Sequence, residues 1–272
     1  MIKKIVFAGC STTAGNELWE EANVPGYKTM SFDQARAVRP SNTEWRDYNY
    51  QNSFPALIGK SLGIETVNLG WPGLSNKEIV GRLVTQFPED KYEDTLAFIQ
   101  LTTHNRFLLR FQEGKESDTF GSFVAGLGTD NRLSRHQQNL MTEMFFEFFP
   151  ETLLSLDDFV YIDWAIKTLK EKGVPCFVVT VDSNVTEWGN WNKANWITDK
   201  PVVPAKNDRD PQYIEEFGLS LWERFIKNNL LTDTIVGIAG KDNLLPRYHI
   251  NQYAHKVLAE KIIEELKNVK LV

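Results

Sequence analysis

The chain has 272 residues, of which 42% are hydrophobic and 24% charged, and its formal net charge is −6. This composition is typical of a globular protein and excludes wholesale disorder. The acidic balance, without a run of basic residues, is unlike the electrostatic footprint of a general DNA-binding or RNA-binding protein. We expect one domain over residues 1–272, although the length alone would also allow two small domains.

The sequence shows no signal for export or membrane insertion. The apolar run that follows Lys4 is too short for a signal peptide, and no segment approaches the roughly 18 apolar residues of a membrane span. We therefore expect a soluble protein that is cytoplasmic or virion-associated, without nucleic-acid or membrane partners. Cys10 and Cys176 cannot form a disulfide scaffold for a chain of this size, and we interpret them as reduced core thiols.

Short apolar runs alternate with amphipathic segments along most of the chain. The runs predict buried strands, and the segments between them, each bounded by a capping residue or a glycine, predict helices. The expected strands are residues 5–8, 64–69, 96–101, 174–180 and a short fifth at 235–238, and the expected helices are 53–61, 76–86, 155–172 and 251–267. This alternation predicts a three-layer α/β/α sandwich with a mostly parallel, flavodoxin-like five-stranded sheet.

Three stretches interrupt this alternation, at about residues 16–51, 107–150 and 182–210. The first is rich in aromatic residues, Pro and Asn and lacks a sustained period, so we expect an insertion without regular elements. The second contains an aromatic-rich segment around residues 141–149 that we expect to be a helical lid or cover. Long connections of this kind commonly carry function.

Parallel strands place their carboxyl ends at one edge of the sheet, where ligands bind in doubly wound folds. Ser11 follows the first expected strand, Gly73 the second, His104 and Asn105 the third, and Asp182 the fourth. A serine hydroxyl needs a base and oxyanion donors to act as a nucleophile. Ser11 could do so at its turn, or it could simply cap the first helix, and its position alone leaves both interpretations open.

Four short blocks, taken in order, resemble the SGNH or GDSL-type hydrolase superfamily. The blocks are residues 9–15 (GCSTTAG), 68–76 (NLGWPGLSN), 101–106 (LTTHNR) and 249–251 (HIN). The resemblance implies Ser11 as nucleophile and first oxyanion donor, Gly73 as backbone donor and His249 as base. It implies an ester hydrolase that needs neither metal nor cofactor, and the sequence shows no zinc, calcium or P-loop spacing.

The chain departs from the family pattern at the acid of the triad. The family places this acid three residues before the histidine, where this chain has Pro246. Asp242 lies nearby and could orient the imidazole of His249. Alternatively, a main-chain carbonyl could accept from its Nδ1 and leave a Ser–His dyad.

The third block departs from the pattern by one residue. Strict alignment puts His104 where the family has an asparagine, and a one-residue bulge would bring Asn105 to that place as the last oxyanion donor. We favour Asn105. Arg106 could bind an acidic substrate or form a salt bridge within the site, and Asn76, which closes the second block, completes the candidate oxyanion and substrate residues.

Tryptophans gather near several of the expected strand ends. Aromatic faces stack on sugar rings and cover acyl groups, although such residues also pack loops. The positions are Trp19, Trp45, Trp71, Trp188, Trp191 and Trp196. The first hypothesis is therefore a serine esterase acting on O-acyl groups, such as acetyl groups, of a carbohydrate. The alternatives are a catalytically weak glycan-binding or virion structural module, and another acyl or phosphodiester transfer in which Arg106 serves an anionic substrate.

Overall fold

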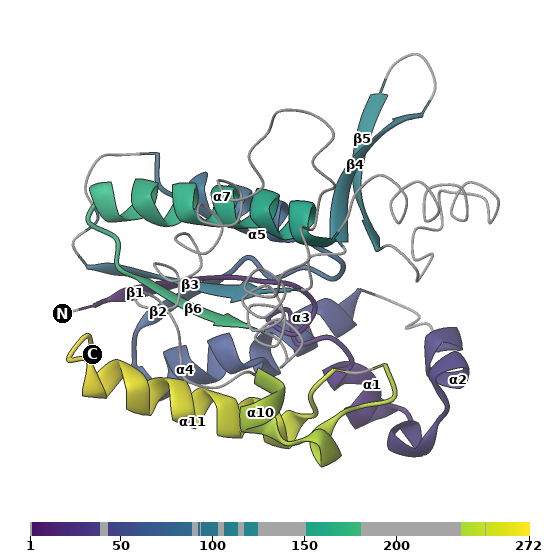
Figure 1. Ribbon diagram of the computed structural model, residues 1–272. Coiled ribbons are helices and arrows are strands. Elements are labelled where there is room, and N and C mark those ends of the chain that lie inside the picture. Colours follow the sequence, from purple (N-terminus) through teal and green to yellow (C-terminus); the bar gives the residue numbers. More distant parts are fainter. Residues whose placement is uncertain are drawn as a thin grey trace, which may run out of the picture.

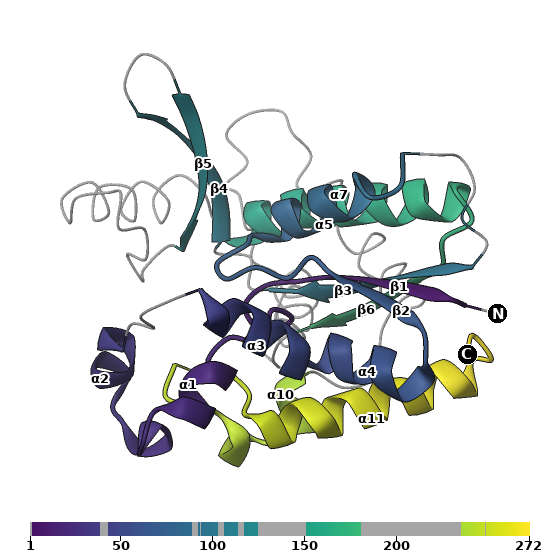
Figure 2. The ribbon, with the colours of Figure 1, turned by 180° about the vertical axis from the view of Figure 1, so that it is seen from behind.

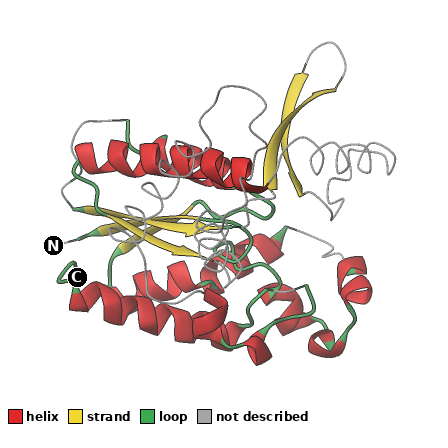
Figure 3. Ribbon diagram, viewed as in Figure 1, coloured by secondary structure: helices red, strands yellow, loops and turns green. Residues whose placement is uncertain are grey.

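The computed structural model describes residues 2–38, 43–88, 92, 94–102, 106–113, 117–124, 151–180, 235–247 and 249–272 (Figures 1 and 3). The elements within these residues are, in chain order, β1 (Lys4–Ala8), α1 (Leu18–Asn23), η1 (Tyr27–Thr29), α2 (Phe32–Ala37), α3 (Glu44–Asn52), α4 (Phe54–Leu62), β2 (Glu65–Asn68), α5 (Asn76–Val84), β3 (Thr95–Leu101), β4 (Arg106–Glu113), β5 (Ser117–Val124), α7 (Glu151–Glu171), β6 (Cys176–Thr180), α10 (Ile235–Ala239), η2 (Lys241–Asn243) and α11 (Gln252–Asn268).

A parallel sheet in the order β2-β1-β3-β6 forms the centre of the fold. The expected parallel α/β architecture is confirmed, and this order matches the first four strands of the flavodoxin-like arrangement. The chain crosses from β2 past β1 to β3, so the topological switch point lies between β1 and β3. Ser11 follows β1 at that point.

The prediction of a fifth strand at residues 235–238 is wrong, because this segment forms α10. Ile235 and Ala239 are buried, whereas Gly237 between them is exposed. Residues four apart lie on one side of a helix, so these two side chains pack together on the core beside α11. A short apolar run fits a strand and a buried helix equally well, and the packing partner decided between them.

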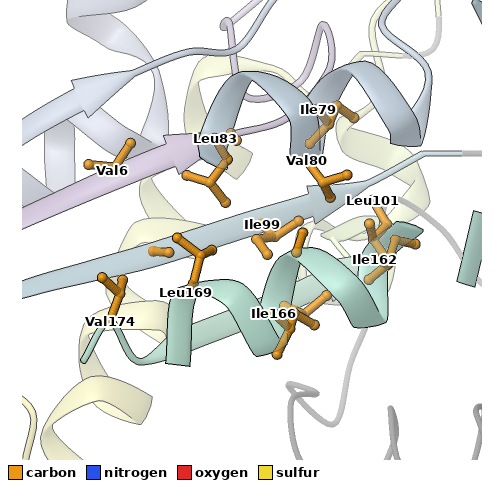
Figure 4. Packing of buried hydrophobic residues seen from close by; sticks show 14 of the residues in the cluster. Val6, Ile79, Val80, Leu83, Ile99, Leu101, Ile162, Ile166, Leu169 and Val174 are labelled. Carbon is orange, nitrogen blue, oxygen red and sulfur yellow. The ribbon is translucent and has the colours of Figure 1, made fainter. Parts of the chain in front are cut away.

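Helices cover both faces of the sheet, which makes the three layers. Helices α5 and α7 lie on one face and α4, α10 and α11 on the other (Figures 1 and 2). Alternation along β1 and β3 supplies both cores: Val6 and Ile99 face α5 and α7, whereas Phe7 and Phe98 face α4 and α11. Figure 4 shows the first of these clusters, with side chains from α5, α7 and the strands in contact.

Residues 16–51 contain helices, so the expectation of an insertion without regular elements is wrong. The described parts of this stretch form α1, η1, α2 and α3. Helix α2 begins with a capping box in which Ser31 accepts from Gln34 N and the Gln34 side chain accepts from Ser31 N. Helices this short carry too few turns for a hydrophobic period to be visible, so their local caps and tertiary contacts define them.

Two further expectations concern the segments between the main elements. The part of residues 107–150 that the structure describes lies in an antiparallel pair, β4 and β5, in which Arg106 faces Val124. The expected helix at 141–149 and the insertion at 182–210 lie outside the described residues.

Both cysteines are free thiols, and burial raises the pKa of Cys176 to about 12. None of the described helices combines the length and the apolar character needed to cross a membrane.

The packing of α11 on α4 buries a histidine completely. His255 Nδ1 accepts a hydrogen bond from Phe54 N (3.1 Å) at the start of α4, and its ring stacks on Phe54. Its Nε2 has no partner within the described residues. Burial, with a smaller contribution from His249, lowers the pKa of His255 to about 3 from 6.5, so the ring is neutral in the folded protein.

This buried histidine predicts a loss of stability in acid. In the unfolded chain, His255 binds a proton as the pH falls below its ordinary pKa of 6.5. In the folded chain, the same group binds a proton only as the pH approaches about 3. The free energy of unfolding therefore has its full value above pH 6.5, and it decreases by about 1.4 kcal/mol for each unit that the pH is lowered between 6.5 and 3. Urea unfolding between pH 7 and 4 should show a steeper loss for the wild type than for His255→Phe, in which this group cannot titrate. Parallel pH profiles for the two proteins would contradict this assignment.

Candidate active site

The segment after β1 folds into a compact turn at the carboxyl edge of the sheet. Backbone hydrogen bonds join Ala14 N to Cys10 O (3.1 Å), Gly15 N to Thr12 O (3.1 Å) and Asn16 N to Ser11 O (2.9 Å). Ser11 is 7% exposed. Helix α1 begins only at Leu18, with Glu17 at its N-cap position. Ser11 is therefore not the cap of that helix, and its hydroxyl is not used to satisfy the helix end. We call residues 9–17 the nucleophile turn.

The side chain of Gln100, a buried residue of β3, is hydrogen-bonded to the nucleophile turn. Gln100 Oε1 accepts hydrogen bonds from Cys10 N (3.2 Å), Thr13 N (3.2 Å) and Thr13 Oγ1 (2.6 Å). A side chain at Gly9 would collide with this pair, since its Cβ would lie 2.0 Å from Thr13 Oγ1. Sequence reasoning missed Gln100, although a polar residue within the apolar run of residues 96–101 was a usable signal.

The loop after β2 packs directly against the nucleophile turn. The Asn68 side chain donates to Thr13 O (2.8 Å) and accepts from Gly70 N (2.9 Å), and Trp71 N donates to Gly9 O (3.2 Å). A Cβ at Gly70 would lie 2.6 Å from Ala14 N, so only glycine allows this approach. The loop that contains Gly73 is therefore joined to the nucleophile turn on both sides of Ser11, through Gly9 and Thr13.

Two backbone N–H groups at this edge are available to a bound oxygen. Ser11 N and Gly73 N donate to no other group within the part of the chain that the structure describes. Gly73 has a left-handed backbone (φ 85°), and a Cβ placed there would meet nothing within 4 Å. Backbone N–H groups without an internal acceptor are able to donate hydrogen bonds to a bound oxygen.

The side chain that orients His249 is Glu17. Its carboxylate accepts four hydrogen bonds: from Tyr27 Oη (2.5 Å) and Arg247 N (3.1 Å) on Oε1, and from His249 N (3.3 Å) and His249 Nδ1 on Oε2. Glu17 has no exposed surface, and the side chain of His249 is 14% exposed. A buried carboxylate with this set of donors fixes both the ring orientation and the tautomer of a histidine.

The charge of Glu17 is maintained although the group is buried. Burial by itself raises the pKa of Glu17, but the hydrogen bond and charge of His249, the hydrogen bond of Tyr27 and the charge of Arg247 outweigh it, so that the pKa is lowered overall. One turn later, burial raises the pKa of Glu20, and the neighbouring charge of Glu17 adds to the rise. The pKa values of the two carboxyl groups are thus shifted in opposite directions, and the shift at Glu17 favours its ionised form.

The backbone at Glu17 is strained in a way that serves this contact. Glu17 has φ 72° and ψ −4°, the left-handed conformation, which costs a residue with a side chain about 1–2 kcal/mol. Gly15, two residues earlier, is also left-handed, and a Cβ there would lie 2.5 Å from Asn49 O. Strained residues persist where their surroundings over-determine them, and here four hydrogen bonds to one carboxylate do so.

Asp242 and Pro246 lie in the loop that presents His249, and within the described residues neither forms a hydrogen bond or ion pair with its imidazole. Asp242 is in η2 and is exposed to solvent. The loop is closed by hydrogen bonds from Leu245 N to His249 O (2.7 Å) and from Asn251 N to Asn243 O (2.8 Å). The Nδ1 partner is therefore Glu17, 232 residues away in sequence, instead of Asp242 or a main-chain carbonyl.

Ser11 and His249 both belong to the described part of the chain, and no hydrogen bond joins them there. Ser11 Oγ donates instead to Cys10 Sγ (3.8 Å). The two residues are linked through the nucleophile turn, because Asn16 bonds to Ser11 and the next residue, Glu17, holds His249. Catalytic hydrogen bonds are often long in unliganded enzymes and tighten when substrate binds.

The remaining predicted residues divide into those that the structure describes and those that it does not. Asn76 is buried, and both of its amide hydrogens are engaged: it donates to Thr102 O (3.0 Å) and to Asp158 Oδ2 (2.7 Å), while its Oδ1 accepts from Thr102 N (2.8 Å). Asn76 thus secures the end of β3 and has no donor left for substrate. Arg106 is placed only as the first residue of β4. The predicted residues that lie outside the described part are His104, Asn105, Asp182, Trp188, Trp191 and Trp196.

Comparisons with known proteins give only distant structural likenesses. No protein-family model and no curated protein matches the chain. Similar solved structures include a lipolytic protein of the G-D-S-L family from Veillonella parvula (11% identity, 97% of this chain and 98% of that one, TM-score 0.44). They also include a lipase/acylhydrolase from Enterococcus faecalis (15% identity, 98% of this chain and 96% of that one, TM-score 0.42). A third is an acetyl xylan esterase from Butyrivibrio proteoclasticus (9% identity, 98% of this chain and 64% of that one, TM-score 0.46). Likeness at this level carries no conclusion about the reaction, which is argued from the site itself.

Proposed function

We propose that the protein is a serine ester hydrolase in which Ser11 is the nucleophile and His249 the general base, with Glu17 as the third member. The observation that carries this proposal is the buried, ionised Glu17 carboxylate that accepts from His249 Nδ1. With the ring proton held on Nδ1, the lone pair of Nε2 is available as the base. This is the division of roles in a Ser–His–acid triad, in which the acid orients the ring and stabilises its cation.

The reaction follows from these positions. Ser11 Oγ attacks the acyl carbon as Nε2 of His249 takes the hydroxyl proton, and the carbonyl oxygen becomes an oxyanion held by Ser11 N and Gly73 N. The C–O bond to the alcohol breaks, and the alcohol leaves with the proton from His249. Water then attacks the acyl-serine while His249 removes one of its protons. The bond from the acyl carbon to Oγ breaks, His249 returns the proton to Ser11 Oγ, and the free acid is released. Asn105, or His104, supplies a third oxyanion donor in this proposal.

For the substrate, we propose an O-acyl ester of a carbohydrate. The support comes from aromatic residues: Trp71, on the loop that carries Gly73, is 38% exposed. Trp19 and Trp45 belong to the helices packed beside this loop, α1 and α3. Indole faces are suited to sugar rings, because they offer a large flat apolar surface with one polar atom at its edge.

The direct test is covalent labelling of Ser11. A fluorophosphonate probe should modify one serine stoichiometrically, and peptide mass spectrometry should locate it at Ser11. Ser11→Ala should lose the label, whereas Ser61→Ala, on the exposed side of α4, should keep it. Sugar binding together with no labelling of the wild type would instead identify a glycan-binding module without turnover, and would overturn the proposal.

A further inference from the structure

An arginine is held between two indole rings next to the nucleophile turn. Arg46 Cζ lies 5.1 Å from the ring centroid of Trp71 and 5.3 Å from that of Trp45, its neighbour on α3. Both distances are within the range of cation–π contacts. Arg46 and Trp71 come from segments 25 positions apart in the sequence, so their contact is a tertiary one.

The helix that carries Arg46 contacts both loops of the candidate active site. Tyr50, one turn after Arg46, donates to Gly70 O (3.1 Å), and Asn49 accepts from Trp19 N (2.7 Å). Trp71, the other ring in contact with Arg46, donates through its backbone N to Gly9 O, two residues before Ser11. Helix α3 packs against α1 and α4 (Figure 2). These contacts place the guanidinium at the rim of the site, beside the loop that supplies the oxyanion donor Gly73.

The guanidinium is exposed and has no carboxylate partner within the described residues. The two rings restrain its plane, while its N–H donors at the edge remain directed to solvent. A second exposed arginine, Arg82 of α5, is close enough for its charge to act, with that of Arg46, on Tyr50. Glu44 and Asp47 lie beside Arg46 in the first turn of α3, but no ion pair joins either of them to Arg46 within the described residues.

We propose that Arg46, supported by Trp45 and Trp71, binds a carboxylate of the substrate, so that the preferred substrate is an O-acyl ester of an acidic sugar such as a uronate. A planar guanidinium with a restrained orientation makes two parallel hydrogen bonds to a carboxylate, and these are stronger than bonds between neutral groups. This inference rests on the proposed function for the ester, but the recognition of the carboxylate stands on the geometry of Arg46 alone.

The first test measures binding without turnover. Isothermal titration with glucuronate and with glucose should show that glucuronate binds at least about tenfold more tightly, the difference expected from charge-assisted hydrogen bonds. Arg46→Gln should abolish this preference, and Arg46→Lys, which keeps the charge but not the planar fork, should retain only part of it. Lys60→Gln removes one exposed positive charge from α4 and should leave the preference unchanged.

The second test measures turnover of a matched pair, monoacetylated glucuronate and monoacetylated glucose. The kcat/KM ratio should favour the uronate in the wild type and fall towards one in Arg46→Gln, mainly through KM for the uronate, whereas Lys60→Gln should leave both the ratio and the turnover of the neutral ester unchanged. Equal binding and equal kcat/KM for both sugars in the wild type would overturn the carboxylate subsite and leave the esterase intact. If Ser11 of the wild type is not labelled by the fluorophosphonate, but glucuronate still binds in a way that depends on Arg46, the proposed esterase activity is overturned and the proposed carboxylate subsite stands.

Discussion

Ser11→Ala is expected to lower kcat for ester hydrolysis by about a million-fold, close to the uncatalysed level apart from a residual contribution of about 10³–10⁴ from the oxyanion donors and substrate binding. The physical reason is that alanine has no atom that can attack the acyl carbon, and His249 then has no proton to remove from a nucleophile. Substrate binding should change little, because the backbone of the nucleophile turn is held by Gln100 and Asn68 and not by the Ser11 hydroxyl.

The measurement is single-turnover and steady-state hydrolysis of an aryl acetate and an acetylated sugar. A burst of the aryl alcohol, the sign of an acyl-enzyme, should be present in the wild type and absent in the variant. Ser61→Ala serves as the matched control, since Ser61 is exposed on α4. Purified Ser11→Ala with a kcat near that of the wild type would show that another group carries the chemistry.

Glu17→Gln is expected to lower kcat by about 10³–10⁴-fold with a smaller change in KM. Glutamine has nearly the same shape, but its amide can turn an N–H towards His249 Nδ1. The ring would then carry its proton on Nε2, the wrong position for a base. The variant also loses the negative charge that stabilises the imidazolium formed during attack.

A purely structural role for Glu17 would not change the spectroscopy of His249. The wild type should show a far-downfield proton resonance from Nδ1–H in its hydrogen bond to the carboxylate, and Glu17→Gln should lack it. Tyr27→Phe removes one donor to Glu17 Oε1 but leaves Oε2 on His249, so this resonance should persist and kcat should fall only modestly. A Glu17→Gln protein that is folded, retains the resonance and keeps wild-type kcat would exclude Glu17 from the triad.

Much of the scaffold could be predicted from local patterns. The first strand was visible as a continuous apolar run, the helix after Ser75 as an apolar period with a polar cap, and the final helix as an apolar stripe over residues 251–267. The structure places β1, α5 and α11 there. Residues 235–238 were mispredicted because a short apolar run does not distinguish a strand from a buried helix turn. The helices of residues 16–51 were missed because each is too short to show a period.

By itself, the sequence determined the parallel α/β sandwich and the placement of Ser11 and Gly73 at strand ends, because both depend on residues close together along the chain. The partner of the histidine was decided only by the tertiary structure. Glu17 lies 232 residues before His249, and no local spacing connects them. The same holds for Gln100 beneath the nucleophile turn and for Trp71 on Arg46, since each contact forms only when the sheet brings separate strand ends to one edge.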